Sequence, residues 1–311
     1  MKKIFSSIMI STLILGGCSQ MNQDSNSKSK SVNESKSIPE EMPADKYKGQ
    51  GFQPNAEEDA IEYAKKHRKA FEKRGEQFFK DNFNLNVKAT NVVGSGDGVE
   101  VFVHCDDHDI VFNASIPLEK DSIHHKGSMR STDDGDAMSD MVGTVLSGFE
   151  YRANKEEFDN LTQYFKDNED KYHYTGFTKE AINKTQNMGY QNEYYYIAYL
   201  SRTLSEYRKY YEPLINKNDA EFKEGMKKAR KDLEYTAKSN AATTLFSTQK
   251  NYSKKKNTPN VFAIAKELEK RNDMPKFTYL SLQFTDNQIN TQNPFYEAQD
   301  VTDFGVFGYD N

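Results

Sequence analysis

The distribution of hydrophobic positions divides the chain into three parts. An apolar run, residues 4–15, is followed by a polar stretch rich in Ser, Lys and Asn that continues to about residue 54. A bilayer crossing needs roughly 20 apolar residues, so this run is too short to span a membrane and is typical of a secretory signal. We therefore expect a signal peptide at 1–17, a disordered tether at 18–54 and a single globular domain at 55–311.

The apolar run ends in a motif of its own. Lys2 and Lys3 precede the run, and Leu15-Gly16-Gly17-Cys18 closes it. This ending resembles the bacterial lipobox, in which an aliphatic residue and two small residues come before a cysteine. The resemblance implies cleavage between Gly17 and Cys18, with Cys18 becoming an N-acyl, S-diacylglycerol cysteine. Because each buried CH₂ contributes about 0.8 kcal/mol, two acyl chains hold stably. We expect a lipid anchor on the extracellular face of the cell membrane.

Alternation of apolar and polar positions predicts three strands in the first third of the body. It runs over residues 87–93, 99–103 and 110–116, with Gly94-Ser95-Gly96-Asp97-Gly98 between the first two. This glycine-rich loop lacks the Gly-Lys-Ser/Thr ending of a phosphate-binding loop, and a strand rather than a helix follows it, so a hairpin turn is expected. Three strands joined by tight turns predict an antiparallel β-meander.

Apolar residues at helical spacing predict helices over most of the remaining chain. The first is expected from an Asn55 cap to about Lys80. The later predicted helices are 136–149, 158–165, 178–187 with Thr178 as cap, 197–211, 222–245, and one to about residue 271 that opens at Thr258-Pro259. Residues 276–285 return to strand character, and the aromatic tail 304–309 is expected to dock on the body. The order predicts an α+β fold, a small antiparallel β-meander packed with a helix-rich remainder, mostly α by residue count.

Composition narrows the possible partners. Removal of 1–17 takes away Lys2 and Lys3, which leaves 40 basic against 47 acidic residues and a net charge near −7. Nucleic-acid binders normally carry a basic surplus, so we expect no nucleic-acid partner. With Cys18 committed to lipid, Cys105 has no partner for an internal disulfide. The expected contacts are the membrane, through the covalent lipid, and an unidentified protein or wall polymer.

The densest group of possible metal ligands is His104-Cys105-Asp106-Asp107-His108-Asp109. On one continuous strand His104 and His108 would lie about 13 Å apart, too far to share a zinc ion. A hairpin at 106–107 could bring them together, and His124 and His125 could then complete a site. The simpler interpretation is a turn, because Asp is a common turn residue. We expect no metal, no cofactor and no catalytic residue, and keep His104, His108 and His124 as weak metal candidates.

Other clusters also allow two interpretations each. Cys105 could be a nucleophile, but packing as a small hydrophobe is simpler. Asp133-Asp134-Gly135-Asp136 with Asp140 could hold calcium, yet the EF-hand register is absent, and a solvated helix start explains the run better. Eight tyrosines between residues 190 and 211 could form a binding surface or an aromatic core. Lys254-Lys255-Lys256 could contact anionic lipid or a wall polymer, but three charges make a weak patch, so a solvated loop is expected.

Two classes of function follow. The favoured one is a membrane-anchored bacterial surface lipoprotein that binds a partner without catalysis. The alternative is an extracytoplasmic enzyme or metal-binding protein that acts on cell-wall material, which requires acid–base groups to converge in a cleft. The commonest hydrolase, metalloprotease and redox signatures, Gly-x-Ser-x-Gly, His-Glu-x-x-His and Cys-x-x-Cys, do not occur in the sequence.

The chain as a whole resembles one protein family. The signal with its lipobox, the Ser/Lys/Asn tether and the body from Ala56-Glu57-Glu58-Asp59-Ala60 to Phe304-Gly305-Val306-Phe307-Gly308 carry the resemblance. It is similar to a staphylococcal lipoprotein family catalogued as a domain of unknown function. This resemblance implies lipidation of Cys18 and placement on the cell surface, and it brings no activity, substrate or catalytic residue.

Overall fold

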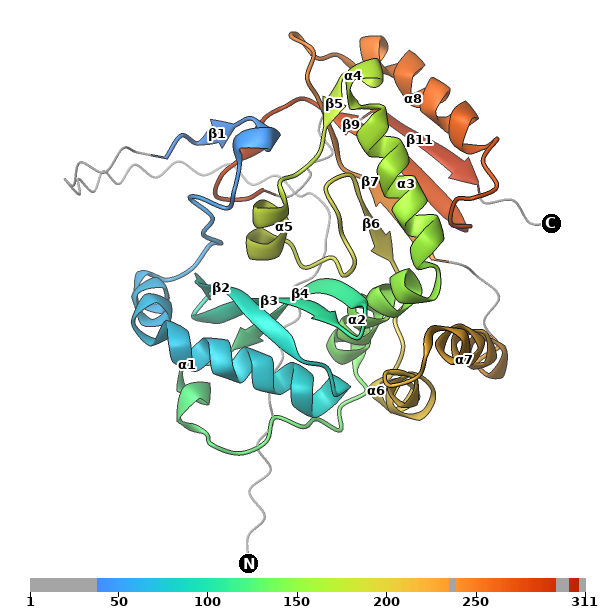
Figure 1. Cartoon of the computed structure of the whole chain (residues 1–311). Helices are drawn as coiled ribbons and strands as arrows, with labels where there is room; N and C mark the ends of the chain where they lie inside the picture. Colours follow the sequence, from blue (N-terminus) through green and yellow to red (C-terminus); the bar gives the residue numbers. More distant parts are fainter. Residues whose placement is uncertain (1–37, 235–238, 295–301, 308–311) are drawn as a thin grey trace, which may run out of the picture.

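The computed structural model describes residues 38–234, 239–294 and 302–307. Two main β-sheets, each packed against its own helices, organise these residues (Figure 1). Helices occupy more of them than strands do, and the predicted α+β class is confirmed. None of the helices in these ranges combines the length and the apolar character that crossing a bilayer requires.

The first sheet is the predicted meander. Strands β2 (Val87–Ser95), β3 (Gly98–Asp107) and β4 (Ile110–Leu118) pair antiparallel in that order. Only Gly96 and Asp97 separate β2 from β3, and Gly96 adopts a positive φ of 56°, so the glycine-rich loop is the hairpin turn that the sequence indicated.

Helix α1 (Glu58–Phe83) lies along this sheet, as Figure 1 shows. It begins three residues after the predicted Asn55 cap, and Glu57 occupies the N-cap position. Its closest approach is at Gly75, where an added Cβ would lie 2.6 Å from Cγ1 of Val101. Helix α2 (Asp136–Ala153) packs against β4 on the same core, so the sheet face bearing Val101 is fully covered.

The second sheet combines distant parts of the chain. Its strands are β5 (Tyr174–Thr175), β6 (Tyr195–Ala198), β7 (Asn240–Thr243), β8 (Leu245–Ser247), β9 (Tyr279–Thr285) and β11 (Thr302–Phe307). Both β7 and β8 run parallel to β9, whereas β11 pairs with β9 antiparallel. Helices α3 (Lys155–Asp167), α4 (Glu169–Tyr172) and α8 (Lys254–Leu268) complete this half. The hydroxyls of Tyr164 and Tyr172 donate to Glu267, which joins α3 and α4 to α8.

Two predicted helices are wrong because their residues belong to this second sheet. The predicted helix 222–245 ends early, as α7 (Asp219–Asp232), and its last apolar residues lie in β7 and β8. The predicted helix 197–211 likewise opens with strand β6. Strands as short as these cannot be told from a helix by the spacing of their apolar residues alone.

The start of α8 also differs from the prediction. The helix begins at Lys254, with the Ser253 side chain accepting from the backbone N–H of Lys256, and Pro259 lies inside it. Lys254, Lys255 and Lys256 therefore form its first turn rather than a loop. The predicted strand 276–285 is confirmed as β9, and residues 304–307 of the aromatic tail dock on it within β11. The end of that tail, 308–309, lies outside the described residues.

The predicted disordered tether is wrong for residues 38–54. Strand β1 (Glu41–Met42) pairs with β10 (Ile289–Asn290), and η1 (Ala44–Lys46) follows it. Tyr47 is fully buried, and its hydroxyl donates to the carbonyl of Thr291 at 2.9 Å. A polar, proline-rich segment is ordered here because a distant part of the chain supplies its hydrogen bonds and its apolar contacts.

The connecting elements complete the fold. They are η2 (Lys120–His124), α5 (Lys179–Thr185), and a continuous helical segment of α6 (Leu204–Glu206), η3 (Tyr207–Tyr211) and η4 (Glu212–Leu214). The predicted Thr178 cap is confirmed, because its side chain accepts from the backbone N–H of Ala181. Helix α5 contacts β2 and β3, while the segment from α6 to η4 lies near α2 and α7.

Candidate functional site

The three candidate histidines do not come together. His104 lies on β3, where its Nδ1 is 3.0 Å from Oδ1 of Asn113, and burial lowers the pKa of its imidazole. His108 lies in the turn before β4, with its Nδ1 2.9 Å from the adjacent Asp107 carboxylate. His124 ends η2, 3.4 Å from the Tyr63 hydroxyl of α1. Across the described ranges, no group of three or more His, Cys, Asp or Glu side chains is arranged to hold a metal ion.

Cys105 packs as the small hydrophobe that the simpler interpretation predicted. Its side chain is fully buried in the core between the first sheet and α1. Burial raises the pKa of its thiol to about 12, so the thiol stays protonated at neutral pH. A protonated, inaccessible sulfur cannot act as the nucleophile of the alternative interpretation.

The tyrosines contribute mainly to the core rather than to a binding surface. The fully or nearly buried ones are Tyr190, Tyr194, Tyr195, Tyr207 and Tyr211. Their rings make stacked and edge contacts, such as the stacked pair of Tyr151 and Tyr190 with centroids 4.2 Å apart. The dense tyrosine sequence is therefore an aromatic core that links α2 and α3 to both sheets.

The acidic run 133–140 precedes and opens α2, as a solvated helix start should. Asp133 accepts from the backbone N–H of Gly135, and Asp140 accepts from the Ser201 hydroxyl at 2.7 Å. Asp134 reaches further: its Oδ1 accepts from the backbone N–H of Ser205 at 2.9 Å. That bond connects the segment before α2 to the start of α6.

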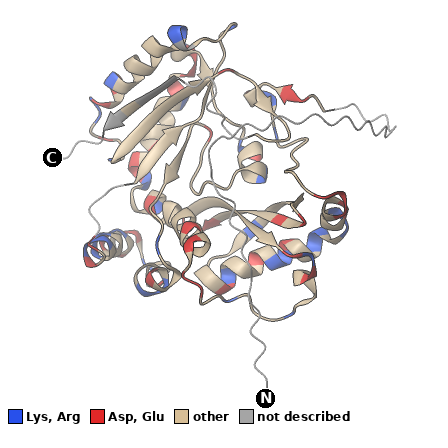
Figure 2. Cartoon of the chain, turned by 180° about the vertical axis from the view of Figure 1, so that it is seen from behind, with Lys and Arg blue, Asp and Glu red and all other residues tan. Residues whose placement is uncertain are grey.

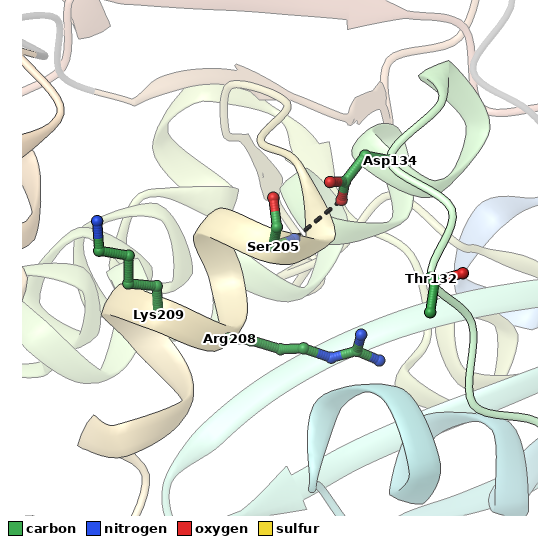
Figure 3. A pocket seen from close by; sticks show the side chains of 5 residues that line it. All are labelled: Thr132, Asp134, Ser205, Arg208 and Lys209. Carbon is green, nitrogen blue, oxygen red and sulfur yellow. Dashed lines mark hydrogen bonds between the residues drawn. The ribbon is translucent and has the colours of Figure 1, made fainter.

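A shallow polar pocket of about 490 Å³ lies at this junction. Its lining residues are Thr132, Asp134, Ser205, Arg208 and Lys209. Figure 3 shows the Arg208 side chain extending from the helical segment toward the loop that carries Thr132. The Lys209 side chain points away from that loop. The pocket is thus formed by two segments about 70 residues apart in sequence, held together by the bond from Ser205 to Asp134.

The helical segment that carries three of these residues is irregular. It begins with a capping box between Thr203 and Glu206. Residues 207–211 then form a π-helix, and the backbone N–H of Glu212 donates to Tyr207, five residues back. Pro213 follows at once and lacks an N–H, so the helix cannot continue its regular hydrogen bonds there. Such π-turns are rare and occur frequently at functional sites.

The charges at the pocket are fixed by hydrogen bonds. The Arg208 guanidinium donates to the carbonyl of Ser131 at 2.9 Å and to Oδ1 of Asn82 at 3.3 Å, while burial and the nearby Arg130 lower its pKa. Hydrogen bonds from the backbone and the side chain of Ser205 lower the pKa of Asp134, so its carboxylate is ionised at neutral pH. A carboxylate with a depressed pKa is a weak base, so it is poorly suited to activate the Ser205 hydroxyl for catalysis.

The sequence indicated little of this pocket. The sequence marks Asp134 only as part of an acidic run, and no pattern in it marks Thr132, Ser205, Arg208 or Lys209. The capping-box pattern Thr203-x-x-Glu206 and the later Pro213 could have marked the helical segment. No local pattern could place it beside Asp134, since that contact depends on the packing of the whole core. Gly17 and Cys18 lie outside the described residues.

The fold and the pocket define an α+β protein with two main sheets and a hollow lined by polar side chains beside an irregular helix. The chain belongs to the family described as "Protein of unknown function (DUF1672)", which it matches over residues 34–308. The expected resemblance to a family of unknown function is confirmed at that level.

Among solved structures, this fold is similar to the crystal structure of a DUF1672 family protein from Staphylococcus aureus subsp. aureus Mu50. The two share 55% sequence identity and superpose with a TM-score of 0.85. The match covers 88% of this chain and 100% of the other. A search of curated proteins found no significant match.

Proposed function

We propose that this protein is a surface lipoprotein, anchored by Cys18 to the extracellular face of the cell membrane, whose body binds a partner without catalysis. The observation that carries the anchor is the sequence Leu15-Gly16-Gly17-Cys18 directly after a short apolar run. Nineteen residues then separate Cys18 from Ile38, where the described body begins. That spacing lets the body lie close to the membrane surface without entering it.

The anchor is tested by replacing the acylated thiol. We expect the wild-type protein to fractionate with membranes and to show a diacylated amino-terminal Cys18 by mass spectrometry. Cys18→Ala should appear in the medium or remain as an uncleaved precursor, because no thiol is left to accept the lipid. Cys105→Ala is the matched control, since its buried thiol takes no part in anchoring. Membrane retention and normal cleavage of Cys18→Ala would refute the anchor.

The binding role is supported by the state of the reactive groups. The Cys105 thiol is buried and protonated, His104 is bonded to Asn113, and Asp134 is held by Ser205. These side chains are occupied in the fold, and so is Arg208, whereas Lys209 and the hydroxyl-bearing Thr132 and Ser205 line the pocket and are exposed. A lysine beside hydroxyl groups can bind polar or anionic groups of a partner.

The pocket is tested by site-specific crosslinking on intact cells. A photoreactive residue at Lys209 should capture a defined partner, and the same residue at Lys228, exposed on α7, serves as the control. Lys209 suits the test because it is exposed, whereas Arg208 holds the Ser131 backbone in place. Equal capture from both positions, or none from Lys209, would contradict binding at this pocket.

A further inference from the structure

Helix α1 presents a row of lysines on its outer face. Lys66, Lys69, Lys73 and Lys80, here called the α1 lysine stripe, are all exposed. The last three follow the kink at His67, and their spacings of four and seven residues place them on one side of a regular helix. Figure 2 shows basic positions recurring along α1. At 1.5 Å per residue these three lysines span roughly 16 Å.

The acidic residues between 62 and 81 of α1 are held by other groups, so none of them forms an ion pair with the stripe. Every carboxylate between residues 62 and 81 of α1 has a partner. These contacts are Glu62 with Lys65 at 2.8 Å, Glu72 with Arg68 at 2.9 Å, Glu76 with the backbone N–H of Ala89 at 3.1 Å, and Asp81 with the backbone N–H of Met129 at 2.7 Å.

The ammonium groups of the stripe are exposed and lack a direct carboxylate partner among the described residues. Within the part of the chain that the structure describes, its four lysines form no ion pair. The whole chain nevertheless carries a formal net charge of −5. Because these lysines lie together on one face of an acidic protein, an anionic surface attracts that face more than the rest of the protein.

We propose that the α1 lysine stripe docks the body onto the anionic phospholipid headgroups of the membrane. This inference rests on the proposed anchor at Cys18. The nineteen residues between Cys18 and Ile38 reach at most about 70 Å when fully extended, so the body cannot leave the vicinity of the bilayer. Each lysine near an anionic membrane favours binding about fivefold, and the tether turns that weak attraction into persistent contact by raising the local concentration.

A partition experiment tests the docking without the anchor. The chain from residue 18 onward, carrying Cys18→Ser, is sedimented with vesicles of roughly one-third phosphatidylglycerol in phosphatidylcholine, and with phosphatidylcholine alone. We expect partition onto the anionic vesicles only, reduced at least about 50-fold in the variant Lys66→Gln, Lys69→Gln, Lys73→Gln, Lys80→Gln. The control neutralises four exposed lysines of α7, Lys223, Lys227, Lys228 and Lys231, and should bind as wild type.

A second measurement uses the unchanged stripe and does not depend on how a variant folds. The chain from Cys18 onward is coupled through the Cys18 thiol to a maleimide lipid. The Cys105 thiol is buried, so it should not react with the maleimide. Lysine acylation followed by mass spectrometry should show the stripe protected severalfold on anionic vesicles relative to neutral ones, with the α7 lysines unchanged. Salt at roughly 0.5 M should remove the protection.

The outcomes separate the two proposals. Equal labelling of the stripe on anionic and neutral vesicles overturns the docking, even if Cys18 is acylated in cells. Protection by a soluble polyphosphate but not by anionic vesicles also overturns it, because the stripe would then recognise a polymer rather than a bilayer. If the body docks in these experiments but Cys18 is unmodified in cells, the proposed anchor is refuted and the docking proposal stands.

Discussion

Individual side chains in this protein gain their properties from burial more than from their neighbours in sequence. Cys105 and His104 are adjacent on β3 and point to opposite faces of the sheet. One is fully buried in the apolar core, and the other is half-buried beside Asn113. In both cases burial disfavours the charged form, which raises the pKa of the thiol and lowers that of the imidazole.

Titration of His104 should make stability depend on pH. Because the folded pKa lies below the ordinary value of 6.5, the unfolded chain binds a proton that the folded chain resists. Stability is therefore full above that value and falls as the pH drops below it, by up to about 1.4 kcal/mol per pH unit for this one proton. Urea unfolding at pH 7.5 and 5.5 measures the effect, and His104→Gln should reduce the difference. His108→Gln, which changes an exposed turn, is the control; an equal reduction there would contradict the assignment.

The Cys105 thiol should be unreactive in the native protein. At pH 8 its pKa of about 12 keeps it protonated, and the side chain has no exposed surface. In a Cys18→Ser chain a thiol reagent should label Cys105 only after unfolding, and the labelling rate should follow the unfolding rate. Rapid labelling under native conditions would show that the core around β3 opens locally.

At the scale of elements, close approaches set the packing of the helices on the first sheet. At Gly75, α1 comes so near Val101 that an added methyl would lie 2.6 Å from a methyl carbon. Gly75→Ala should destabilise the fold by about 1–3 kcal/mol despite the better helix propensity of alanine. Gly127→Ala is the matched control, because its added methyl meets no atom within 4 Å, and it should change stability by less than about 0.5 kcal/mol. Chemical denaturation distinguishes the two, and equal effects would refute the close packing.

A buried ion pair fixes α7 to α2. Arg230 donates to Glu150, whose side chain is 6% exposed, and Asn154 donates to the same carboxylate at 3.0 Å. Burial alone would lower the pKa of Arg230, but the charge of Glu150, its hydrogen bond to Arg230 and the neighbouring Tyr199 together raise that pKa. Arg230→Met should cost about 3–5 kcal/mol, because it leaves a buried carboxylate without its cation.

The coupling between these two residues is measured by a double-mutant cycle. Arg230→Met combined with Glu150→Gln should cost less than Arg230→Met alone, since no buried charge remains unpaired. Urea midpoints of the wild type, the two single variants and the double variant supply the cycle. Additive losses would mean that the pair contributes no coupling across the interface of α2 and α7.

At the scale of the whole molecule, the segment at 38–54 ties the start of the body to its end. The backbone N–H of Ala44 donates to Asn287, the hydroxyl of Tyr47 donates to the carbonyl of Thr291, and β1 pairs with β10. A chain that begins at residue 55 should lose about 3–5 kcal/mol, chiefly through the lost burial of Tyr47. Amide exchange in β10 should rise with it.

The matched truncation removes residues 18–37 and retains every contact of the segment at 38–54. It should leave the thermal midpoint and the amide exchange of β10 unchanged. A comparable loss from both truncations would place the stabilising contacts before residue 38 and contradict the role of Tyr47.

Sequence patterns determined the features that depend on near neighbours. The three-stranded meander, the Thr178 cap and the α+β class follow from local spacing. Strand alternation and helix caps can be recognised in the sequence because their hydrogen bonds form within a few residues or across a tight turn.

Tertiary structure alone decided which distant residues meet. Residues 240–243 and 245–247 form strands β7 and β8 because β9 pairs with them. Residues 38–54 are ordered because β1 pairs with β10 and the Tyr47 hydroxyl donates to the carbonyl of Thr291. The pocket likewise exists because core packing brings Ser205 to Asp134. Each of these contacts stabilises the fold only because a residue far along the chain takes part in it. The spacing of residues within a short stretch of sequence contains no information about that distant residue.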